Sequence, residues 1–483
     1  MKSNRTSAAI AAGVALTLGL AACSDRNKAS NEAATSATSA ASAPSSAAGS
    51  GATSAAAGAE SSSAPAAATE AGANAGVDKV FNPSDEKGGT LTFANPGDWD
   101  SLDPADTYYA YSWNFIRNYG RSLVVFKAAP GAEGAKLVPD LAEALGVPSD
   151  DAKTWTYKIR AGIKFEDGTP VTSKDVKYGV LRSLDKDIFP NGPTYFNDFL
   201  ALAKDYKGPY KSKGVDTKAI ETPDDQTIVF HLNQPFSGMD YFAQLPATIP
   251  VPEAKDTGAK YKEHVISTGP YMFETNNLGK DFTLVRNANY DAATDPESGR
   301  KALPDQMKVQ LNVNADDIDN RLQSGDLDID IAGSGLQPAA QGKVLADEAA
   351  KAKSDAALVA RTWYTQLNTD VAPLDNIECR KAVLYAADKS GYQRAYGGQT
   401  GGEIATSLLP PLVPGATPID LYDAKTTPGG DVAKAKAALQ ACGQPNGFAT
   451  NISYRTERPK EKATAEALQQ SLAKVGILSL IHI

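Results

Sequence analysis

Histidine and cysteine are scarce in this chain, whose 483 residues include three of each. Histidine is the commonest general base of hydrolases and a frequent zinc ligand. Apart from the last six residues, the segment expected to fold contains only His231 and His264, and no two histidines have the spacing of a zinc motif. A Gly-x-Ser-x-Gly nucleophile elbow is also absent. These absences argue against the commonest hydrolases, although a glycosidase built on two carboxylates would leave no motif.

A block rich in lysine and arginine is missing as well. The chain has 48 basic and 57 acidic residues, which gives a formal net charge of −9. A protein that binds nucleic acid needs a basic face to contact the phosphates. We therefore expect no nucleic-acid partner.

An acidic run suggests a calcium loop but lacks its spacing. Asp326, Asp328 and Asp330 match the first three ligands of an EF-hand loop. The sixth position, however, is Ile331 where the sharp turn needs glycine, and no glutamate occupies the twelfth. We expect no metal site and no cofactor in this chain.

The apolar run near the amino terminus is too short to span a bilayer comfortably. Lys2 and Arg5 precede it, and it covers residues 8–22. It ends in Leu-Ala-Ala-Cys at Cys23, which resembles a bacterial lipobox. Residues 1–23 are therefore predicted to be a lipoprotein signal peptide, with a lipidated Cys23 holding the exported chain on the outer face of the cytoplasmic membrane. The alternative is an ordinary signal peptide with an incidental cysteine.

Residues 24–77 are almost entirely Ala, Ser, Gly and Thr. Such a segment buries too little apolar surface to offset the entropy of ordering it. We expect it to be a disordered tether.

Residues 154–176 carry the strongest local signals. Trp155, Tyr157 and Ile159 alternate with polar residues, which predicts a strand with one buried face. Thr172, with Asp175 three positions later, predicts a helix that begins with a capping box.

This stretch resembles the signature of extracellular solute-binding proteins, family 5, of peptide-type ABC importers. Residues 268–271 (Thr-Gly-Pro-Tyr) and 287–290 (Asn-Ala-Asn-Tyr) resemble a further strand pair of that family, and the likeness runs from residue 88 to 477. The resemblance implies an α/β, two-lobed periplasmic-binding-protein-like fold of class II, with the extra small subdomain of peptide binders.

The same resemblance divides the chain. Residues 88–120 and 246–345 would form the main part of the first lobe, 121–245 its small subdomain, and 355–483 an incomplete second lobe. Residues 478–483 resemble translated sequencing-adaptor DNA. We therefore expect a reading frame truncated at its carboxyl end.

Aromatic residues supply the candidates for ligand contact. In the resembled family, the loop after the first strand and its Leu-Asp-Pro sequence faces the ligand cleft, although aromatic residues at this density also suit a core. Residues 362–368 are expected to be a strand that opens the second lobe, so at most one of its two adjacent aromatic residues can face the cleft. The candidate ligand contacts are Tyr108, Tyr109, Tyr111, Tyr195, Trp363 and Tyr364.

Cys379 and Cys442 are the two remaining cysteines. In an exported chain they could form a disulfide, or each could be a buried thiol on a helix. Asp375 or Asn376 is expected to cap the helix that carries Cys379.

The resemblance implies a monomeric, membrane-tethered receptor without catalytic activity. It would capture oligopeptides or a similar solute and deliver them to the permease of an ABC transporter. The same fold could instead bind nickel, haem, an oligosaccharide or a siderophore, or receive a peptide signal. Scarce histidine argues against nickel, and a secreted hydrolase is the remaining alternative.

Overall fold

The computed structural model of the chain describes residues 76–80, 83–357, 359, 361–413 and 415–482. All of them belong to one compact unit. The predicted signal peptide with Cys23, and nearly all of the predicted tether, lie outside the described residues. Within the described ranges, no helix is long and apolar enough to cross a membrane.

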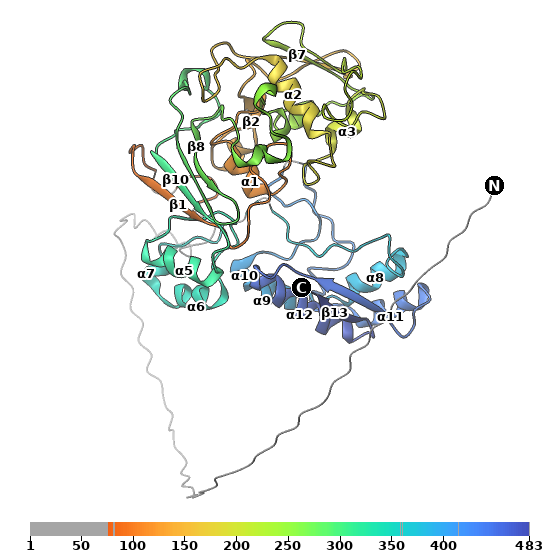
Figure 1. Ribbon diagram of the computed structural model, residues 1–483. Coiled ribbons are helices and arrows are strands. Elements are labelled where there is room, and N and C mark those ends of the chain that lie inside the picture. Colours follow the sequence, from red (N-terminus) through yellow and green to blue (C-terminus); the bar gives the residue numbers. More distant parts are fainter. Residues whose placement is uncertain (1–75, 81–82, 358, 360, 414, 483) are drawn as a thin grey trace, which may run out of the picture. The chain divides into compact units, whose positions relative to one another are not determined.

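The chain consists of short helices and strands (Figure 1). The strands are β1 (Thr90–Ala94), β2 (Val124–Phe126), β3 (Leu137–Pro139), β4 (Val147–Pro148), β5 (Thr154–Lys158), β6 (Ile220–Glu221), β7 (Thr227–His231), β8 (Tyr271–Asn277), β9 (Asp281–Arg286), β10 (Gln306–Gln310), β11 (Ile329–Asp330), β12 (Ala449–Ser453) and β13 (Leu478–His482). The α-helices are α1 (Ala110–Ile116), α2 (Ser173–Ser183), α3 (Tyr195–Phe199), α4 (Met239–Ala243), α5 (Ala315–Ser324), α6 (Pro338–Ala346), α7 (Glu348–Lys351), α8 (Ile377–Ala386), α9 (Lys389–Tyr396), α10 (Gly398–Gly401), α11 (Val432–Ala441) and α12 (Pro459–Ala473).

A five-stranded sheet has the order β11-β1-β10-β9-β8. β1 runs parallel to β10 and β11, whereas β9 is antiparallel to both of its neighbours. Its core holds the buried ring of Trp99, whose centroid lies 5.1–5.3 Å from those of Tyr111, Phe115 and Phe282. These edge-to-face contacts stabilise the loop that follows β1.

A four-stranded antiparallel sheet has the order β4-β5-β7-β6. β5 is the strand predicted from residues 154–176, and its Trp155 and Tyr157 are 5% and 1% exposed. α2 packs on this sheet and begins as predicted, since the backbone N–H of Thr172 donates to the carboxylate of Asp175 over 2.8 Å. Both predictions of this segment are confirmed.

A buried cation joins α2 to the loop after β1. The guanidinium of Arg182 donates to both carboxylate oxygens of Asp103, over 2.6 and 2.9 Å, and to Asp256 over 3.0 Å. All three side chains are at most 2% exposed. The Leu-Asp-Pro sequence that precedes the aromatic loop is thereby fixed to the helix.

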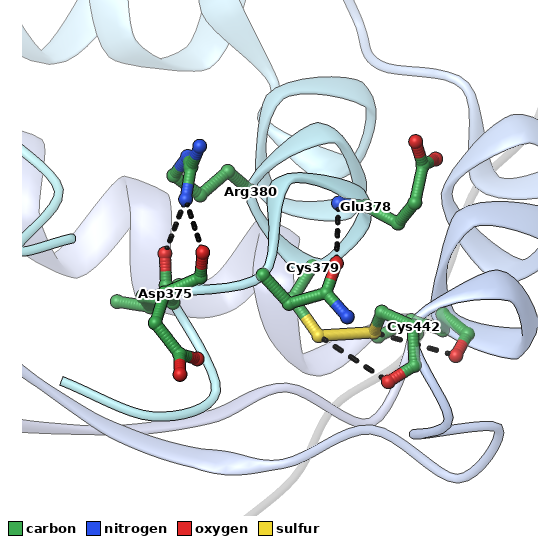
Figure 2. Close-up of a disulfide and its surroundings, with 8 residues drawn as sticks. Asp375, Glu378, Cys379, Arg380 and Cys442 are labelled. Atoms are coloured by element: carbon green, nitrogen blue, oxygen red, sulfur yellow. Dashed lines mark hydrogen bonds between the residues drawn. A yellow bond between two sulfur atoms is a disulfide. The ribbon is translucent and has the colours of Figure 1, made fainter. Parts of the chain in front are cut away.

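The carboxyl-terminal part has its own apolar core, to which α8, α11, α12, β12 and β13 contribute. β12 and β13 pair in parallel. Asn376, one of the two predicted capping residues, caps α8, since its side chain accepts from the backbone N–H of Glu378, and Cys379 is buried. The structure joins Cys379 to Cys442 in a disulfide, so α8 is linked to the end of α11 (Figure 2).

The prediction of a strand at residues 362–368 is wrong. These residues form neither helix nor strand. A strand exists only where its backbone groups pair with a neighbouring strand. Among the described residues, β12 and β13 pair with each other and with nothing at 362–368.

Candidate functional site

A cleft of about 470 Å³ lies between the loop after β1 and the connection from β12 to α12. Its volume falls within the roughly 300–1,000 Å³ of typical small-molecule sites. The lining residues are Gly97, Asp98, Trp99, Asp100, Tyr108, Tyr109, Tyr111, Asn191, Arg455, Glu457 and Arg458.

One carboxylate holds the aromatic loop in place. Asp100 accepts hydrogen bonds from the backbone N–H groups of Tyr108 and Tyr109, over 2.7 and 3.0 Å, and from the Thr107 hydroxyl over 2.9 Å. The side chains of Tyr108 and Tyr109 remain 50% and 42% exposed. Large aromatic side chains are usually buried, so two exposed rings on a fixed loop offer a preformed apolar surface.

Two arginines come from the opposite wall. Arg455 lies 5.9 Å from the ring centroid of Tyr109, within reach of a cation–π interaction. It also forms a two-nitrogen ion pair with Glu461 on α12. Arg458 donates from one terminal nitrogen to the hydroxyl of Ser334.

A much smaller cavity of about 20 Å³ adjoins the cleft and shares Glu457 and Arg458 with it. This volume is enough for about one water molecule. Lys460 lines this cavity, and its Nζ atom donates to the Ser334 carbonyl over 2.9 Å. Burial lowers the pKa of Lys460 and raises that of Asp330 on the same wall. Beside the small cavity, polar groups of α12 therefore pack against the segment after β11.

The profile of bacterial extracellular solute-binding proteins, family 5, matches residues 136–479. The chain belongs to this family. It is 28% identical to the probable D,D-dipeptide-binding periplasmic protein DdpA of Escherichia coli K12, over 80% of this chain and 69% of the relative. It is also 28% identical to the oligopeptide-binding protein OppA of Bacillus subtilis 168, over 55% of this chain and 48% of the relative.

Solved structures confirm the fold expected for a family 5 solute-binding protein. The chain resembles the clavulanic acid biosynthesis oligopeptide binding protein 2 with 40% identity and a TM-score of 0.74, over 86% of this chain and 74% of that one. The α/β, two-lobed fold predicted from the sequence is therefore confirmed. The chain spans 69% of the length of DdpA and 48% of the length of OppA. The family is one of binding proteins.

The structure brings three of the six predicted contact residues together on the cleft: Tyr108, Tyr109 and Tyr111. Tyr111 is only 8% exposed and packs against Trp99 and Tyr109. Burial raises its pKa to about 12.

The other three predicted contacts lie elsewhere. Tyr195 does not line the cleft; its hydroxyl is bonded to that of Tyr108. Trp363 lines the small cavity and packs against Tyr396 at 5.2 Å. Tyr364 is 63% exposed and lines neither cavity.

Sequence reasoning missed the residues of the opposite wall. Arg455 and Arg458 stand in the short connection before a helix whose first residue is Pro459. The helix start has a local signal, since proline favours that position. No local signal shows that this connection meets a loop some 350 residues earlier in the chain. Within the described ranges, no group of three or more metal-ligating side chains is found.

Proposed function

We propose that this family 5 protein is the solute receptor of an ABC importer. It captures oligopeptides or a similar solute in the cleft lined by Tyr108, Tyr109 and Arg455, and it delivers them to permease subunits. The names of the relatives support peptides as the solute class, since they are D,D-dipeptide- and oligopeptide-binding proteins. Catalysis is not part of this proposal.

The observation that carries the proposal is the make-up of the cleft. One wall presents two exposed tyrosine rings, and the other presents guanidinium groups. Aromatic surface accepts side chains of varied shape, while charged groups orient the polar main chain of a ligand. A receptor for varied peptides needs both properties.

The division into lobes belongs to the same proposal. Residues 88–120 with 246–345 would form the main part of the first lobe, 121–245 its small subdomain, and 355–483 the second lobe. In support, every strand of the five-stranded sheet comes from residues 88–120 or 246–345. The four-stranded sheet comes wholly from residues 121–245. The carboxyl-terminal core draws on residues 374–477.

The proposal includes the export and anchoring of the chain. The lipobox-like sequence before Cys23 supports a lipid anchor, with residues 24–77 as a tether. In this proposal the receptor acts as a monomer outside the cytoplasmic membrane.

A thermal-shift screen of the purified chain tests the proposal. The screen would contain mixed tripeptides, oligosaccharides and nickel or haem chelates. A ligand at 100 times its Kd stabilises the folded state by about 2.7 kcal/mol, which is easily detected. Tripeptides are expected to raise Tm. A rise with only a sugar or a chelate would contradict the proposed solute class.

A further inference from the structure

Lys460, in the first turn of α12, is a buried cation that forms no ion pair among the described residues. The residue is 7% exposed, and its Nζ atom donates to the carbonyl of Ser334 and lies 5.4 Å from the ring centroid of Tyr396. Burial lowers the pKa of Lys460 although the carboxylates of Asp319 and Asp330 act in the opposite direction. The folded state therefore disfavours the charged form, and a gain in stability does not explain why a lysine stands here.

The turn that Lys460 contacts, residues 332–335, presents its carbonyl groups to cations. The carboxylate of Asp330 accepts from two backbone N–H groups of the turn, over 3.0 and 3.1 Å. Arg361 donates to two carbonyls of the turn, over 3.3 Å each. Lys460 takes the next carbonyl along the chain, over 2.9 Å. The turn is thus fixed by a carboxylate from its own segment and held by cations that come from later in the chain.

This turn is attached to one wall of the cleft. It follows β11 directly, and β11 pairs with β1, where Asp330 stands opposite Ala94. The loop after β1 carries Tyr108 and Tyr109, the exposed rings of the cleft. A displacement of the turn would therefore act on the strand that supports these rings.

Lys460 itself is attached to the other wall. Glu461, the next residue, is paired with Arg455, which lies 5.9 Å from the ring centroid of Tyr109. Glu457 and Arg458 in the same connection line the cleft, whereas Lys460 does not. The contact between Lys460 and the turn therefore joins the two walls without forming part of the cleft lining.

We propose that Lys460 is a positioning residue that holds the two walls of the cleft together and sets how long a bound solute stays. Its ammonium group fixes the connection from β12 to α12 on the carbonyls of residues 332–335, and Arg455 is thereby held opposite Tyr109. This inference rests on the proposed function and adds to it a residue that governs release without touching the solute.

Stopped-flow fluorescence with trialanine tests the inference in Lys460→Met, which removes the ammonium group and keeps an unbranched side chain. Trp99 lines the cleft and supplies the signal. Because the walls then separate more readily, dissociation should be about tenfold faster, the factor that corresponds to loss of one hydrogen bond from a charged donor. Association should change little, since the lining of the cleft stays the same.

A matched control and a stability measurement separate positioning from a structural role. Lys462→Met makes the same substitution two residues later on α12, at a lysine whose side chain is 58% exposed, and it should leave both rates unchanged. The Tm of Lys460→Met should equal or exceed that of the wild type, because replacing a buried charge by an apolar side chain of similar size does not cost stability. A residue with only a structural role would lower Tm when replaced.

Unchanged dissociation of trialanine from Lys460→Met would overturn the inference and leave the proposed function intact. A lower Tm with equal changes in both rates, or the same acceleration in Lys462→Met, would also overturn it. Failure of the wild type to bind trialanine would contradict the proposed peptide receptor itself, and the inference with it.

Discussion

The phenolic oxygens of Tyr108 and Tyr195 lie 2.9 Å apart. The exposed Tyr195 ring stacks on Phe242, with centroids 5.5 Å apart, and Phe242 belongs to the buried core that includes Trp155 and Tyr157 of the four-stranded sheet. An exposed tyrosine of the cleft is thereby connected to that core. The hydrogen bond, together with burial, raises the pKa of Tyr108 to about 12.

Replacement of Tyr195 by phenylalanine tests this connection. Tyr195→Phe keeps the ring but removes the hydroxyl, so the pKa of Tyr108 should fall toward its ordinary value of 10. Ring-carbon NMR of labelled tyrosine, followed against pH, measures the change. Tyr241→Phe, at an exposed tyrosine away from the cleft, is the control and should leave Tyr108 unaffected. An unchanged pKa in Tyr195→Phe would contradict the connection.

The buried Arg182 should be essential for stability. Arg182→Met leaves the carboxylates of Asp103 and Asp256 buried without a cation, a change that costs about 3–5 kcal/mol. Urea unfolding measures the loss. Lys174→Met breaks an ion pair in which both side chains are about two-thirds exposed, and it should cost less than about 1 kcal/mol. Equal losses in the two variants would refute the role assigned to Arg182.

The disulfide between Cys379 and Cys442 should stabilise the carboxyl-terminal core. It closes a loop with a sequence separation of 63, for which the chain-entropy estimate is about 4 kcal/mol. The Cys379→Ala, Cys442→Ala double variant should therefore unfold at lower denaturant concentration than the oxidised protein. The reduced wild type should unfold close to the double variant. A double variant as stable as the oxidised protein would show that the disulfide contributes little.

Asp295 should make the free energy of unfolding depend on pH in the acidic range. Burial alone would raise its pKa, but Arg300, at 2.8 Å, and Arg121 more than offset burial and lower the pKa to about 2. Because the folded-state pKa lies below the ordinary 3.8, ionised Asp295 stabilises the fold above about pH 4. That contribution is lost as pH falls through about 2. It amounts to about 2–3 kcal/mol, since one pKa unit corresponds to about 1.4 kcal/mol.

Unfolding of Asp295→Asn and of the wild type across pH measures this contribution. The difference in unfolding free energy between them should be constant from pH 7 to about 5 and should shrink between pH 4 and 2. Asp225→Asn, at an exposed pair, is the control and should show little change over the same range. A difference that does not shrink in acid would contradict the lowered pKa.

Local chemistry made much of the fold predictable. The capping box of Thr172 and Asp175, the strand with Trp155 and Tyr157, and the helix capped by Asn376 each depend on residues within one turn or one strand. Such signals survive folding because tertiary packing reinforces them.

Only one of the two walls of the cleft could be predicted from the sequence. The aromatic composition of the loop with Tyr108 and Tyr109 can be seen in the sequence. The contact of this loop with Arg455 depends on long-range packing, which the sequence does not show. The same limit explains the error at residues 362–368, since pairing between strands is not encoded within a single segment. Tyr195 was predicted as a ligand contact, but the structure places its hydroxyl on Tyr108.

The most direct test of the account is tripeptide binding by the wild type, Tyr109→Ala and Tyr241→Ala, measured as the rise in Tm with a mixed tripeptide pool. Tyr109 is 42% exposed on the cleft, whereas Tyr241 is 57% exposed outside it. The account predicts a clear rise for the wild type and Tyr241→Ala, and loss of most of that rise for Tyr109→Ala. No rise in the wild type, or an equal rise in Tyr109→Ala, would contradict it.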